Sequence, residues 1–128
     1  MANLFDLMAR IFISSIFLFS GINKIFNLEN TAQWMEGYGV HKIFLYPTII
    51  LEIVMPVLII VGYKTKFAGV LLLLFSISTA FIFHNDFSNQ IQLIAFLKNI
   101  GLAGGLLFLL IHGTKDWSLE AKKKFVRL

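Results

Sequence analysis

The chain has 128 residues, of which 58% are hydrophobic and only 14% are charged. Soluble domains carry roughly 45–50% apolar and about 25% charged residues, because polar groups must cover their surface. The composition therefore excludes an ordinary soluble domain and predicts an integral membrane protein. The absence of cysteine excludes disulfides, thiolate chemistry and Cys-ligated metal centres. The net charge of +4 comes largely from a basic C-terminal tail, which suits a lipid surface better than nucleic acid.

Four apolar stretches each approach the roughly 20 residues that a helix needs to cross a bilayer. They cover about residues 4–26, 43–62, 67–83 and 91–111. The first lacks the basic leading segment and the small-residue cleavage site of a signal peptide, so we expect it to be retained. The predicted fold is all-α: residues 1–128 form a single transmembrane domain built as a four-helix bundle.

Orientation follows from the basic residues outside the spans. An even number of spans places both termini and the "YKTK" loop on one side, and lysine and arginine concentrate on that side. Both termini and the basic tail, residues 113–128, are therefore predicted to be cytoplasmic. On the other side, residues 29–41 contain Trp34 and Tyr38, which predict an interfacial segment with a short helix. An ordinary connector with two exposed aromatic side chains is the alternative.

Several ionisable residues lie inside the spans, where each costs roughly 2.5–3.5 kcal/mol to insert. At a rise of about 1.5 Å per residue, Glu52 and Lys98 lie about 13 and 11 Å below the outer surface, so they are nearly level. Arg10 lies roughly 9 Å from the cytoplasmic side. We therefore predict a buried network of Arg10, Glu52 and Lys98, with hydrogen bonds from Asn99. It either lines a pocket for a polar head group or only holds the helices in register, and Lys98 pairing with Glu52 alone is a further alternative.

Other residues have narrower predicted roles. Lys24, His84 and Asp86 are expected at the outer mouth of the bundle. Small residues that let helices approach closely are Gly21 and the G-x-x-x-G pair Gly101 and Gly105. No histidine has a second histidine at ligand spacing, so no metal site is predicted.

The chain resembles the DoxX family of small four-helix bacterial membrane proteins. The motifs that carry the resemblance are an early Arg10, "SGINK", Glu52, "GYKTKFAG", "FIFHND", "FLKNIGLAGG" and "HGTKDWSLE". The last differs mildly from the family, which often has G-x-G before the aromatic residue and then "SLD". Members are linked to quinol oxidase and thiosulfate–quinone oxidoreductase complexes and to membrane redox protection. The resemblance implies matching positions at Arg10, Gly21, Lys24, Glu52, Gly62, His84, Lys98 and Asn99.

Residues and resemblance together predict an accessory or ligand-binding subunit in the bacterial cytoplasmic (inner) membrane. Its expected ligand is quinone-like or a lipid, since no haem, flavin or metal signature is present in the sequence. Besides the lipid bilayer, its expected partners are other membrane redox subunits or further copies of itself, and not nucleic acid. The sequence leaves open whether the chain has an enzymatic activity of its own and favours a role without one. The alternatives are a small-solute or proton-linked transporter and a non-enzymatic assembly protein.

Overall fold

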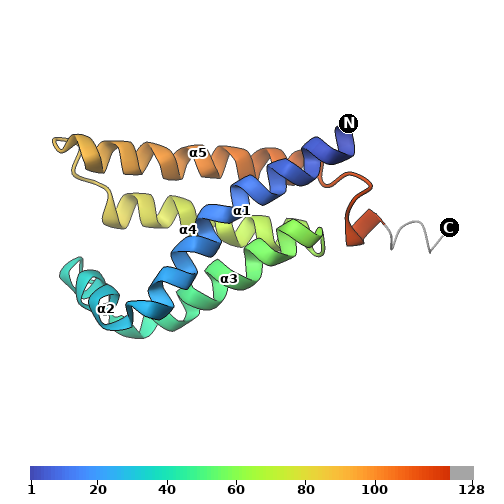
Figure 1. Cartoon of the computed structure of the whole chain (residues 1–128). Coiled ribbons are helices and arrows are strands. Elements are labelled where there is room, and N and C mark those ends of the chain that lie inside the picture. Colours follow the sequence, from blue (N-terminus) through green and yellow to red (C-terminus); the bar gives the residue numbers. More distant parts are fainter. Residues whose placement is uncertain (122–128) are drawn as a thin grey trace.

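The computed structural model describes residues 1–121, and the part of the predicted basic tail at 122–128 lies outside the described residues. Helices make up nearly all of the described chain (Figure 1). They are α1 (Ala2–Phe26), α2 (Leu28–Gly37), the 3-10 turn η1 (Lys42–Phe44), α3 (Leu45–Val61), α4 (Thr65–Phe83) and α5 (Gln90–His112). Four segments are long and apolar enough to cross a membrane, namely α1, η1 together with α3, α4 and α5, which confirms the predicted all-α, four-span architecture.

The spans form two antiparallel pairs. Helix α1 packs along α3, and α4 packs along α5, while contacts between α3 and α4 join the pairs. The start of α1, the turn between α3 and α4 and the segment after α5 share one end of the bundle, which we call the clasp end. Helix α2 and the turn between α4 and α5 lie at the other end, which we call the pocket end (Figure 1).

An apolar core lies between the two ends. Phe17, Ile59, Leu72 and Leu106 supply one buried side chain from each span, and Ala68 completes the cluster. Each falls near the middle of the span or toward the clasp end, so the cluster separates the polar residues at the two ends of the bundle. This apolar cross-section stabilises the bundle, because each of the four spans buries an apolar side chain in it.

Helix α2 packs on the pocket end of the bundle. Met35 on this helix is buried with Leu45 and Phe83 in a second apolar cluster. The Trp34 ring stacks on Phe83, with centroids 4.5 Å apart, and Tyr38 meets the same ring edge-on. These contacts tie the segment between the first two spans to the end of α4, so α2 forms a fixed cover over part of the pocket end.

Candidate functional site

An ion pair between a half-buried lysine and a buried glutamate joins α1 to α3. The Lys24 ammonium lies 2.8 Å from Oε2 and 3.0 Å from Oε1 of Glu52. Ser20, one turn before Lys24, accepts a hydrogen bond from the ammonium at 2.7 Å and donates to Oε1 at 3.4 Å. Glu52 is only 2% exposed. Two opposite charges in contact leave the site neutral, which is how a carboxylate is tolerated at this depth in a membrane.

Glycine brings the two helices close enough for this pair. A Cβ at Gly21 would lie 2.9 Å from Cγ1 of Ile53 and 3.1 Å from Cβ of Glu52. Any larger residue would push α1 away from α3 and lengthen the ion pair. The predicted role of Gly21 in helix packing therefore has a specific position, directly beside the carboxylate.

The ion pair forms part of the wall of a cavity of about 440 Å³ at the pocket end. All four spans and the α2 region contribute to its lining, which is mostly apolar and includes Phe17, Trp34, Phe44, Phe75 and Phe83. The polar side chains in the lining are Ser20, Lys24, Thr48, Glu52, Ser76, Ser78, Thr79, His84 and Asn99. A largely apolar cavity with a few converging polar groups is the usual form of a small-molecule site.

The far wall of this cavity is polar as well. Asn99 on α5 donates from Nδ2 to Thr79 Oγ1 at 3.1 Å, and Thr79 donates to carbonyls of its own helix. Ser76 is buried, and its hydroxyl has no hydrogen-bond partner among the described residues. A buried hydroxyl is normally hydrogen-bonded, so this group is available to a molecule in the cavity. His84 lies at the end of α4, with Nδ1 3.4 Å from Gln92 Oε1.

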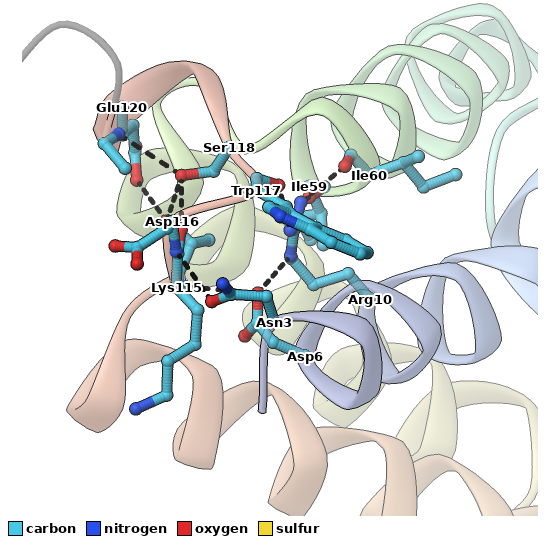
Figure 2. A network of polar contacts seen from close by, with 12 residues as sticks. Asn3, Asp6, Arg10, Ile59, Ile60, Lys115, Asp116, Trp117, Ser118 and Glu120 are labelled. Carbon is cyan, nitrogen blue, oxygen red and sulfur yellow. Dashed lines mark hydrogen bonds and ion pairs between the residues drawn. The ribbon is translucent and has the colours of Figure 1, made fainter. Parts of the chain in front are cut away.

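A second polar cluster closes the clasp end, and Figure 2 shows it around Arg10. The guanidinium pairs with Asp6 at 3.0 Å and donates to the carbonyls of Ile59 and Ile60 at the end of α3. It also donates to the carbonyl of Trp117, beyond α5. Arg10 is 1% exposed, so one buried cation connects α1, α3 and the C-terminal segment.

The C-terminal segment is held at further points. Glu120 accepts a hydrogen bond from the backbone N–H of Thr65 at 2.6 Å, and its own N–H donates to the Gly62 carbonyl at 2.9 Å. The Thr114 hydroxyl donates to Ser118, which packs directly on Gly62. The carboxylate of Glu120 therefore caps the N-terminus of α4, where negative charge is stabilising. We call residues 114–120 and their contacts the clasp.

The structure does not bring the predicted trio of Arg10, Glu52 and Lys98 together. Arg10 belongs to the clasp, and Glu52 pairs with Lys24, which had been predicted at the outer mouth only. Within residues 1–121, Lys98 is exposed and makes no hydrogen bond or ion pair. The spacings Asp6–Arg10 and Ser20–Lys24, each one helical turn, were the signals that pointed to the observed partners.

The other predicted residues are dispersed. Asp86 is exposed in the turn after α4 and accepts hydrogen bonds from Ser88. Gly105 meets α1, since a Cβ there would lie 2.8 Å from Ile13, whereas a Cβ at Gly101 would meet nothing within 4 Å. No cluster of three metal-ligating side chains occurs within the described part of the chain.

Comparison with known proteins identifies the family. The family model for DoxX matches residues 5–85. The chain is 33% identical to the inner membrane protein YqjF of Escherichia coli, over 89% of this chain and 88% of YqjF. It is 31% identical to the inner membrane protein YphA of the same organism, over 91% of this chain and 88% of YphA. The ER-derived vesicles protein ERV29 of Saccharomyces cerevisiae is 32% identical over 60% of this chain and 26% of its own length. No solved structure matches. The chain therefore belongs to the DoxX family and is a multi-pass protein of the inner membrane.

Proposed function

We propose that the protein binds a quinone-like or lipid molecule in the cavity beside the Lys24–Glu52 pair and serves as an accessory subunit in membrane redox processes. The observation that carries the proposal is a mostly apolar cavity of about 440 Å³ with a neutralised ion pair in its wall. This volume lies within the roughly 300–1,000 Å³ of small-molecule sites. The redox association comes from the family resemblance.

The polar groups of the cavity suit an uncharged head group that carries oxygen acceptors. Lys24 and Glu52 compensate each other, so an anionic ligand would have to compete with the carboxylate for the ammonium. Among residues 1–121, the Ser76 hydroxyl has no hydrogen-bond partner, and the Asn99 amide donates to Thr79 alone. Apolar and aromatic side chains surround these groups, which suits a flat ring or an acyl chain.

The proposed orientation puts both termini in the cytoplasm and the cavity in the outer half of the membrane. Its support is the excess of basic residues next to the clasp end: Lys64, Lys66 and Lys115, followed in the sequence by the basic tail. The opposite side has Lys42 outside the spans, while Lys24 is paired inside. The apolar core cluster between the cavity and the clasp favours ligand binding over the alternative of transport across the bundle.

Thermal unfolding of the purified protein with and without decylubiquinone tests the proposal. We expect the quinone to raise the midpoint of the wild type and to lose this effect in Glu52→Gln, which breaks the charge pair in the wall. Ser76→Ala is the second variant, because it deletes a hydroxyl with no partner in residues 1–121 and should keep the fold. Glu36→Gln, at an exposed position on α2, is the matched control.

The result that overturns the quinone assignment is an equal response in the wild type, Glu52→Gln and Ser76→Ala. A co-purified lipid, identified by native mass spectrometry and lost in Ser76→Ala, would assign the cavity to the lipid instead. If the quinone shifts none of the proteins and no lipid is retained, the cavity is not a ligand site.

A further inference from the structure

Helices α1 and α5 touch near one point and then separate. A Cβ at Gly105 would lie 2.8 Å from Cδ1 of Ile13, so the two helices are in contact there. One turn closer to the pocket end, a Cβ at Gly101 would meet nothing within 4 Å. Figure 1 shows the same divergence, with α1 crossing α5 near the clasp end and running away from it toward α2. The seam between α1 and α5 is therefore open in the half of the bundle that contains the cavity.

This opening leads into the cavity. Ile16 and Ser20 of α1 line the cavity from one side of the seam, and Asn99 and Leu102 of α5 line it from the other. Ile16 is 46% exposed, so the wall of the cavity continues onto the outer surface of the bundle. Both helices are membrane spans, and a surface at this depth faces lipid tails. A molecule dissolved in the bilayer can reach the cavity here without passing through water.

Lys98 lies on the part of α5 that borders this opening. It precedes Gly105 by seven residues, which turns it only about 20° away from the helix face that meets α1. Helix α5 begins at Gln90, so Lys98 lies about 12 Å along the span. It is exposed and unpaired within residues 1–121. An unpaired ammonium at this depth is costly and commonly marks the path of a substrate or ion.

We infer that the α1–α5 seam is the lateral portal through which the ligand reaches the cavity from the outer leaflet, and that Lys98 is a positioning residue in it. Its ammonium donates to an oxygen of the ligand head group during passage, before the head group meets Asn99 and Ser76. The inference rests on the proposed function, since it assigns the route to that same cavity.

The test measures how fast decylubiquinone binds to the protein in nanodiscs. The chain has two tryptophans, and Trp34 lines the cavity. Trp117→Phe keeps the carbonyl that Arg10 binds and leaves Trp34 as the sole tryptophan, so quenching of its fluorescence reports arrival of the quinone. Stopped-flow mixing then gives the association rate in this background.

Three phenylalanine substitutions distinguish the routes. Gly101→Phe obstructs the seam at a position where a side chain meets no neighbour, and we expect it to slow association by about tenfold or more. Gly104→Phe is the matched control, because a Cβ there also meets nothing within 4 Å. Its position is turned about 100° around the helix from Gly105, which meets α1. His84→Phe obstructs the cavity at the end of α4 instead. If Gly101→Phe perturbs folding, Gly101→Leu replaces it.

Lys98 is tested by its own pair of variants. Lys98→Met should slow association and dissociation by the same factor and leave the affinity and the unfolding midpoint unchanged, because the ligand passes Lys98 in both directions, and Lys98→Arg should restore both rates. A wild-type rate in Gly101→Phe, or slowing in His84→Phe instead, overturns the portal and leaves the ligand site intact. A wild-type rate in Lys98→Met overturns the role of Lys98, whose side chain would then only extend to the head groups. Absence of quenching in the parent protein overturns the proposed function and the portal together.

Discussion

Replacing Arg10 by methionine should open the clasp. The guanidinium makes an ion pair with Asp6 and hydrogen bonds to three backbone carbonyls. Each hydrogen bond to a charged group contributes roughly 1.5–3 kcal/mol, but the cost of burying Arg10 offsets part of that sum. Loss of one member of a buried pair costs about 3–5 kcal/mol in comparable cases, and we expect Arg10→Met to lower the free energy of unfolding by that amount.

Reversible unfolding in mixed detergent micelles measures this loss, and limited trypsin digestion reports the clasp itself. In the wild type the N–H of Lys115 donates to Asp6, so cleavage after Lys115 should be slow and should accelerate in Arg10→Met. Phe12→Leu, at a 66% exposed position on the lipid-facing side of the same helix, is the control. Adding Asp6→Asn should recover part of the loss, since the double variant leaves no unpaired carboxylate.

The reasoning is refuted if Arg10→Met is as stable as Phe12→Leu and is cleaved no faster after Lys115. That outcome would mean that the carbonyls of α3 and of the C-terminal segment accept hydrogen bonds from other donors with no loss in the free energy of unfolding. A loss of stability without faster cleavage would contradict a narrower point, namely that Arg10 is what holds the segment in place.

Two further substitutions test the clasp from its other side. Gly62→Ala should destabilise the protein well beyond Gly39→Ala. Both positions have a positive φ, at 71° and 81°, but of the two only Gly62 would bring the new Cβ against a neighbour, the Cβ of Ser118. Thermal unfolding of the two variants should differ clearly, and equal midpoints would show that the segment moves aside freely. Glu120→Gln should cost about 1 kcal/mol by weakening the charged cap on α4, whereas Glu36→Gln should cost nothing measurable in the same assay.

The sequence was sufficient for the architecture because length and apolarity decide it. Four runs of about 20 apolar residues, separated by short polar breaks, leave few alternatives to four membrane-spanning helices. The breaks also show which ends of the helices meet. The breaks do not show how α1 crosses the other helices. That crossing follows from close approaches at Gly21 and Gly105 and an absence of contact at Gly101. The cavity and the open seam result from that crossing.

The partners of the charged residues in the spans could not be predicted from their depth in the membrane alone. Two residues at equal depth meet only if their side chains also point toward each other. In a helix the Cα–Cβ bond tilts toward the N-terminus, so a long side chain reaches back along its own helix. Lys24, in the last turn of α1, therefore reaches toward the middle of the membrane, past Ser20 to Glu52. Arg10, early in the same helix, reaches back to Asp6 and the clasp.

The same rule accounts for Lys98 and links it to the portal. Because α5 runs from the pocket end to the clasp end, a side chain on it tilts toward the pocket end. Lys98 is nearly level with Glu52 by residue count, yet this tilt directs it toward the pocket end and away from the carboxylate. The direction of α1 thus brings Lys24 to Glu52. The opposite direction of α5 leaves the ammonium of Lys98 beside the open seam. The cation that the sequence placed in the buried network is the one that remains available to a ligand.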